Sequence, residues 1–136
     1  MTAETKRVTL AWQERLVFRG GEPDGPTTRI DGDNREAPGP MLQLLLAAAA
    51  CTGSDVVVIL EKMRVGLREL TIEVAGIRRE EEPRRYVAIH MDYRLAGQGL
   101  DENKARRAIE LSIQKYCSVI HSLAPDIQIT HGLTLA

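Results

Sequence analysis

The segment from Pro40 to Arg64 constrains the fold of this chain more than any other. Proline fits the first turn of a helix, because its missing N–H would have no partner there. No further proline follows as far as residue 64, and Leu, Ala and Met, which favour helices, are frequent. The predicted helix is apolar on nearly every side as far as Leu60, a pattern typical of a helix buried all round. One small sheet cannot cover every face of it, so we expect a second subunit to cover the rest.

Other segments alternate apolar and polar residues, as half-buried strands do. We predict a strand or strand pair over residues 6–18, a short strand over 27–31, an antiparallel pair over 70–74 and 87–95, and a last strand over 126–135. A second helix is predicted to start at Asp101, a good N-cap residue, and to end at Pro125. Gly66 is the predicted stop of the first helix, and Gly20-Gly21 a loop.

This order of elements predicts an α+β fold with a mostly antiparallel sheet, a long buried central helix and a second helix. The chain has 136 residues, the size of one domain. We therefore expect residues 1–136 to form a single domain.

Composition argues against several classes of function. The net charge is −1 and aromatic residues make up 4% of the chain, so neither an attractive field nor stacking platforms for nucleic acid are expected. Charged residues near the N-terminus replace the apolar core of a signal peptide, and Asp55 would lie near the middle of any membrane span. We expect a cytoplasmic protein with no membrane partner.

Two cysteines are the candidate reactive groups. Cys51 lies in the first helix, and Cys117 lies on the apolar stripe of the second, to which Ser112 and Tyr116 are also assigned. In a reducing compartment such residues are reactive, metal-binding or merely buried, and packing alone is a common role for cysteine. Two core-facing helices in one small domain are expected to be neighbours. Asp55, on the same helix as Cys51, should find a cationic or backbone partner.

A metal site is the alternative for these cysteines. Cys117 and His121 share a helix face, and Cys51 and His131 would complete a Cys₂His₂ set. Structural zinc sites usually take their ligands from short local pairs, and no such pair exists here. We therefore do not expect a metal site, and we interpret His131 as a core histidine and His90 as solvent-facing.

The two cysteine segments resemble the OsmC/Ohr family, the osmotically inducible protein C and organic hydroperoxide resistance proteins. The resemblance lies in residues 37–48, in Cys51-Thr52-Gly53-Ser54-Asp55 with the apolar run after it, and in residues 110–119 around Cys117. The order of elements matches over nearly the whole chain. The details are most similar to a shorter, OsmC-like branch of this family.

The resemblance implies an intertwined homodimer whose long helices are buried between two sheets. It implies a stress-related thiol peroxidase that reduces organic hydroperoxides to alcohols, with Cys51 as the attacking and Cys117 as the resolving cysteine. Cys51 would become a sulfenic acid and then form a Cys51–Cys117 disulfide. A dithiol reductant, such as a lipoylated protein, would reopen the disulfide. The resemblance also implies that no metal or organic cofactor is bound.

One feature departs from the family's pattern. Members carry a glutamate early in the first helix that holds an activating arginine, but Met41-Leu42-Gln43 holds no carboxylate. Glu36 could replace it, and Arg19, Arg29 and Arg35 are the candidate arginines. The alternative function is a non-catalytic OsmC-like protein that binds a small apolar ligand, in which both cysteines only pack.

Overall fold

The computed structural model describes residues 3–136, which form two compact units, one ending at Leu44 and one running from Leu45 to Ala136. The single-domain organisation expected from chain length stays a prediction.

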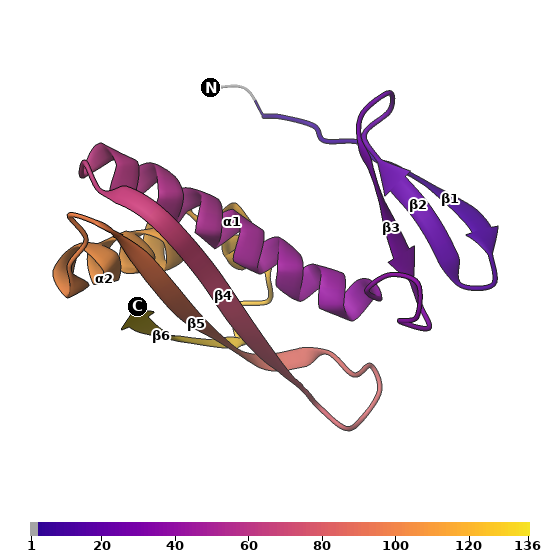
Figure 1. The fold of residues 1–136 in the computed structure, drawn as a ribbon. Helices are drawn as coiled ribbons and strands as arrows, with labels where there is room; N and C mark the ends of the chain where they lie inside the picture. Colours follow the sequence, from indigo (N-terminus) through magenta and orange to yellow (C-terminus); the bar gives the residue numbers. More distant parts are fainter. Residues whose placement is uncertain (1–2) are drawn as a thin grey trace. The chain divides into compact units, whose positions relative to one another are not determined.

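The N-terminal unit is a three-stranded antiparallel sheet in the order β1-β2-β3, drawn in indigo and violet in Figure 1. Its strands are β1 (Thr9–Glu14), β2 (Val17–Gly21) and β3 (Thr27–Asp31). The predicted strand pair and the short strand are confirmed, although Gly20 and Gly21 belong to β2 rather than to a loop. A side chain at Gly20 would lie 2.8 Å from the Thr9 carbonyl oxygen, so the close approach of β1 requires a glycine there.

Helix α1 (Pro40–Lys62) begins at the predicted proline. The helix ends at Lys62, and the residue that stops it is Arg64 rather than Gly66, which is the first residue of β4. Arg64 takes a left-handed conformation with φ of 62°. Its N–H donates to the Glu61 carbonyl and the Val65 N–H donates to the Leu60 carbonyl, which together form a Schellman motif. The stop was mispredicted because the motif is usually built on glycine, and here an arginine occupies that position.

The second unit contains a mixed sheet in the order β4-β5-β6. Its strands are β4 (Gly66–Arg78), β5 (Tyr86–Gln98) and β6 (Gln128–Leu135). The long β4–β5 pair is antiparallel, as predicted, whereas β6 runs parallel to β5. A parallel neighbour requires a crossover, and the helical segment between β5 and β6 provides it (Figure 1).

The core of this unit lies between the sheet and the helices. Alternate β5 side chains are fully buried, namely Ile89, Met91, Tyr93 and Leu95. Helix α1 packs on β4, where a Cβ added at Gly53 would meet the Ile72 side chain at 3.3 Å. The buried stripe of α1 consists of Leu45, Ala48, Thr52, Gly53, Val56 and Leu60. The α+β fold predicted from the sequence is thus confirmed.

The second helical segment is not the single helix that was predicted. It consists of α2 (Glu102–Leu111), one π-helical turn, η1 (Ser112–Tyr116), and a short α3 (Ser118–Ser122). Asp101 caps α2 as predicted, because its carboxylate accepts the Lys104 N–H at 2.8 Å. Cys117 lies between η1 and α3 in an extended conformation, with φ of −70° and ψ of 102°.

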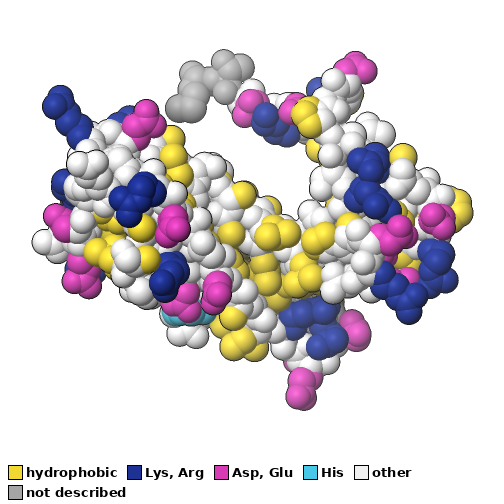
Figure 2. All heavy atoms as spheres, in the orientation of Figure 1, with side chains coloured by type: hydrophobic (Ala, Val, Ile, Leu, Met, Phe, Trp, Pro, Cys, Tyr) yellow, Lys and Arg dark blue, Asp and Glu magenta, His cyan; other side chains and the backbone are white. Residues whose placement is uncertain are grey.

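Helix α1 has an apolar face that the rest of the described chain leaves open. Leu46 is 55% and Val58 is 48% exposed, and Figure 2 shows apolar side chains at the surface over this helix. By length and composition alone α1 could cross a membrane, although a core helix of a soluble protein has the same composition. One chain thus leaves a face of α1 uncovered, as expected from the sequence, and the covering of that face by a second subunit stays a prediction.

Candidate active site

The two cysteines lie together in the second unit. Helix α1 carries Cys51, which is half-buried, and the turn after η1 carries Cys117, which is fully buried. Both are free thiols, and their side chains lie close enough for Cys51 to affect the ionisation of Cys117. The two cysteines are therefore neighbours, as expected because both helices face one core.

The π-helical turn explains why Cys117 is buried. In a regular α-helix, residue 117 would lie about 140° round the axis from residue 112. In η1 the Cys117 N–H donates to the Ser112 carbonyl at 2.7 Å, an i→i+5 contact that places the two residues one above the other. Both are 0% exposed, whereas Tyr116, which the predicted stripe included, is 50% exposed.

A chain of buried polar side chains runs beside the cysteines. The Tyr93 hydroxyl lies 2.8 Å from Thr52 Oγ1, which lies 2.8 Å from Ser112 Oγ. Ser112 Oγ lies 2.8 Å from Asp55 Oδ2. The chain joins strand β5, helix α1 and turn η1, and no buried side-chain nitrogen or oxygen among residues 3–136 lacks a partner.

Counting the available protons identifies the donor in each of these hydrogen bonds. A hydroxyl has one proton and a carboxylate only accepts, so Ser112 donates to Asp55. The contact between Ser112 and Thr52 is then donated by Thr52, and Tyr93 donates to Thr52. Three protons serve three hydrogen bonds that all point toward Asp55. The partner of Asp55 is thus a serine hydroxyl, not the cationic or backbone group that was predicted.

Burial dominates the ionisation of this site. The pKa of Cys117 is raised to about 11, mainly by desolvation, with smaller contributions from Cys51 and from the charge of Asp55, and a backbone hydrogen bond from Ile120 opposes the rise. Desolvation also raises the pKa of Tyr93 to about 12. Cys117 therefore remains a protonated thiol at neutral pH and can donate to the Cys51 sulfur.

The N-terminal unit holds the candidate arginines. The Arg29 guanidinium lies 3.0 Å from Glu36 Oε1, and the Gln43 side-chain amide donates to the Arg29 carbonyl at 3.0 Å. Arg19 donates instead to the Thr27 hydroxyl. Glu36, named from the sequence as a replacement carboxylate, therefore does bind one of the three predicted arginines.

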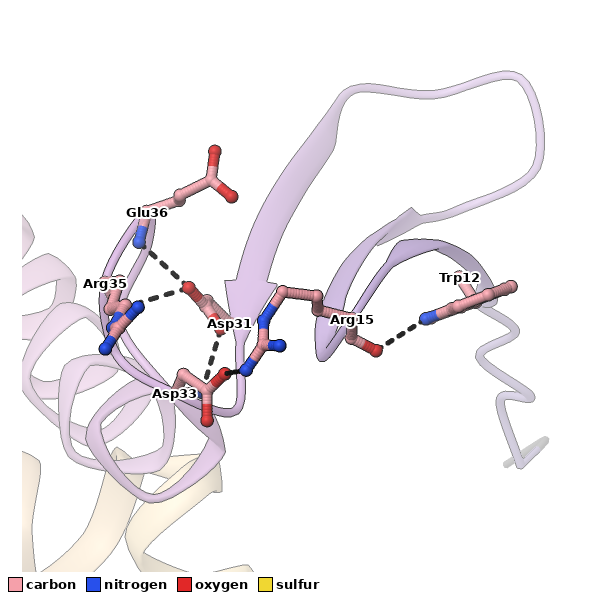
Figure 3. A network of polar contacts seen from close by, with 6 residues as sticks. All are labelled: Trp12, Arg15, Asp31, Asp33, Arg35 and Glu36. Atoms are coloured by element: carbon pink, nitrogen blue, oxygen red, sulfur yellow. Dashed lines mark hydrogen bonds and ion pairs between the residues drawn. The ribbon is translucent and has the colours of Figure 1, made fainter.

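Asp31 organises the loop that carries Glu36 (Figure 3). Its buried carboxylate accepts the backbone N–H groups of Asp33, Arg35 and Glu36 at 2.8, 3.1 and 2.9 Å. The N–H groups of Glu36 and Asp33 are the main cause of its lowered pKa. The same loop is tied to the β1–β2 turn, because the Arg15 guanidinium lies 2.9 Å from an Asp33 oxygen.

The alternative metal set is not assembled. Within residues 3–136 no three His, Cys, Asp or Glu side chains are grouped to hold a metal ion. His121 Nε2 contacts the Ile113 carbonyl at 3.0 Å. His131 is half-buried on β6, and His90 contacts Thr130 and Asp92 on the partly exposed face of the sheet.

Sequence reasoning missed Ser112, Thr52 and Tyr93 as members of the site. A signal was present, because each is a polar residue at a position where the apolar periodicity expects a core side chain. Buried hydroxyls need partners, so three of them in one predicted core could have been grouped. Their connection to Asp55 depends on the π-helical turn, which periodicity does not reveal.

Comparison with known proteins identifies the family. The OsmC-like protein family model matches residues 32–132. This chain belongs to the OsmC-like family. It is 37% identical over 122 residues to Protein YhfA of Escherichia coli, covering 89% of this chain and 91% of that protein.

Solved structures agree with this assignment of the OsmC-like fold. A hypothetical protein from Aquifex aeolicus superposes with a TM-score of 0.88 at 28% identity, covering 98% of each chain. The organic hydroperoxide resistance protein OhrB of Bacillus subtilis superposes with a TM-score of 0.63 at 15% identity, covering 96% of this chain and 98% of that one. The second likeness shows a shared fold alone.

The raised pKa values predict a loss of stability at alkaline pH. A group whose pKa is higher in the folded state stabilises the fold fully below its unfolded pKa. That contribution is lost as pH rises through the folded value, about 11 for Cys117. We expect the free energy of unfolding, measured with urea under reducing conditions, to fall by roughly 1–2 kcal/mol more in wild type than in Cys117→Ala between pH 8 and 11. If the free energy of unfolding fell equally with pH in both proteins, the raised pKa of Cys117 would be contradicted.

Proposed function

We propose that this OsmC-like protein is a thiol peroxidase that reduces organic hydroperoxides to alcohols. The observation that carries the proposal is the contact between the Cys51 and Cys117 side chains at the meeting of two helical segments. A pair of free thiols in contact can close to a disulfide with little movement of the backbone. Family membership and the hydroperoxide-resistance proteins that share the fold support the same reading.

The reaction has two steps in the protein. The Cys51 thiolate attacks the peroxide O–O bond, becomes a sulfenic acid and releases an alkoxide, which takes a proton to become the alcohol. The Cys117 thiol then displaces the sulfenic hydroxyl, which gives a Cys51–Cys117 disulfide and water. The roles follow from exposure, because half-buried Cys51 is open to a substrate and buried Cys117 is not. A dithiol reductant reopens the disulfide, which suits a reducing compartment such as the cytoplasm.

Substitution of each cysteine separates these steps. Cys51→Ser is expected to lose at least a hundredfold of the steady-state consumption of cumene hydroperoxide with a dithiol reductant. Cys117→Ser is expected to keep the first step and to accumulate a sulfenic acid at Cys51, trapped with dimedone and located by mass spectrometry. Ser122→Ala, an exposed serine on α3, is the control. Unchanged consumption by Cys51→Ser would exclude the proposed reaction.

We assign the activating role to Arg29. A guanidinium favours the thiolate form of a nearby thiol. Of the three candidates, Arg29 has both a carboxylate partner, Glu36, and a fixed backbone, held by Gln43. Glu36 and Gln43 would together perform the task of the missing family glutamate.

Arg29→Ala is expected to slow the oxidation of Cys51 at pH 7 at least tenfold, measured by stopped flow with cumene hydroperoxide. Higher pH should partly restore the rate, because hydroxide then forms the thiolate that the guanidinium no longer favours. Arg19→Ala, whose side chain contacts Thr27, is the matched control and should react within twofold of wild type. The assignment of the activating role to Arg29 is wrong if Arg19→Ala slows the oxidation of Cys51 and Arg29→Ala does not.

A second copy of the chain is the proposed cover for the open face of α1. This face borders a shallow apolar groove lined by Leu46, Ala49, Ala50, Gly53, Ser54, Val57, Val58, Leu70 and Ile72. Burial of such a surface is favourable, and an identical apolar helix offers a matching surface. A small apolar ligand in the groove is the alternative, non-catalytic function, and it would leave Cys51→Ser without effect.

Sedimentation equilibrium tests the dimer. Wild type is expected at twice the 15.1 kDa mass of the chain. Val58→Arg, which places a charge on the open face of α1, should shift the equilibrium to the monomer. Leu135→Arg, an exposed apolar position on β6 that is 38% exposed, is the control and should stay dimeric. A monomeric wild type would refute the second copy as the cover.

A further inference from the structure

We propose that the Ser112 hydroxyl and the Asp55 carboxylate position Cys117, so that their contact sets the rate at which the Cys51–Cys117 disulfide closes. This inference rests on the proposed peroxidase function and names positioning residues for its second step. Neither residue touches the reacting atoms by any contact described above. Both act through the backbone turn that carries the resolving cysteine.

Ser112 makes two contacts that link α1 to Cys117. Its side chain lies 2.8 Å from an Asp55 carboxylate oxygen. Its backbone carbonyl accepts the Cys117 N–H at 2.7 Å. A fixed serine therefore fixes the amide of the resolving cysteine, and the point of attachment is a residue on the same helix as the attacking cysteine.

The spacing on α1 completes the arrangement. Cys51 and Asp55 are four residues apart in an unbroken helix, so both lie on one face of it. Thr52, next to Cys51, makes a second contact with the Ser112 hydroxyl at 2.8 Å. The turn that carries Cys117 is thus attached to α1 at two points, Thr52 and Asp55, that both lie within four residues of Cys51.

Disulfide closure depends on this kind of positioning. The bond requires a Cβ–Cβ separation of roughly 3.5–4.5 Å and a restricted dihedral angle. Holding two reactants in the productive arrangement raises their effective concentration by orders of magnitude. A π-helical turn is a short irregular element, and the contact of Ser112 with Asp55 ties this one to α1.

The chemistry of the site favours this role over packing. A carboxylate beside a buried core costs desolvation energy, and an apolar residue at position 55 would avoid that cost. A buried hydroxyl at position 112 is equally unnecessary for packing, because alanine would fill most of the same space. The contact between Ser112 and Asp55 therefore serves to fix the conformation of the turn that carries Cys117.

Reaction with dithiodipyridine measures the two steps without any peroxide. The Cys51 thiolate attacks the reagent, which gives a mixed disulfide and releases one coloured pyridinethione. Cys117 then loses its proton to solvent and attacks the Cys51 sulfur, which closes the Cys51–Cys117 disulfide and releases a second pyridinethione. The second phase therefore reports closure alone, and Cys117→Ser, which lacks it, calibrates the first.

Ser112→Ala and Asp55→Ala are expected to slow the second phase at least tenfold and to leave the first within twofold of wild type. Asp55→Asn keeps an oxygen that can accept the Ser112 proton, so its closure should stay within threefold of wild type. Ser122→Ala, an exposed serine whose hydroxyl contacts the Ser118 carbonyl of its own helix, should change neither phase.

Three results would overturn the inference: an unchanged second phase in Ser112→Ala and Asp55→Ala, an equal slowing of both phases, or Asp55→Asn as slow as Asp55→Ala. The last would assign the effect to charge rather than to the hydrogen bond. If wild type closes its disulfide with dithiodipyridine but does not react with cumene hydroperoxide, the peroxidase proposal fails while the positioning role stands.

Discussion

The contact between α1 and the π-helical turn is the interaction on which the rest of this site depends. Helix α1 is unbroken for 23 residues and gives Cys51, Thr52 and Asp55 fixed relative positions. The turn brings Ser112 and Cys117 to the same buried side, where the Ser112 hydroxyl meets two of those residues. Without this contact the second cysteine would follow the ordinary helical period and face elsewhere. The π-helical turn thus places the thiols of two separate helical segments next to each other.

Sequence reasoning found the elements whose pattern is regular. Pro40 and the residues after it determine α1, and strict alternation determines the β4–β5 pair. The cysteines were rightly expected to be neighbours because each lies on a core-facing helix. The π-helical turn was missed because a stripe at helical spacing tolerates one inserted residue, so Tyr116 and Cys117 both fitted it. The parallel direction of β6 was missed because alternation gives the faces of a strand but not its direction.

The departure from the family pattern at Met41-Leu42-Gln43 has a physical counterpart in the N-terminal unit. A glutamate inside a helix would hold an arginine with a single side chain. Here two residues hold Arg29, since Glu36 binds its guanidinium and Gln43 binds its backbone carbonyl. Asp31 makes Glu36 available by binding the N–H groups of the loop that carries it. The sequence could name Glu36 as a replacement but could not predict that it pairs with Arg29, because that pairing depends on the folded positions of β3 and the loop after it.

The central claim is that Cys51 and Cys117 form one redox unit in which only Cys51 meets the oxidant. Titration of free thiols before and after one equivalent of cumene hydroperoxide tests it most directly, with Cys51→Ser treated in parallel. The account predicts rapid loss of both thiols in wild type and a retained Cys117 thiol in the variant. Thiols that stay intact in wild type, or a Cys117 thiol lost at the same rate in Cys51→Ser, would contradict it.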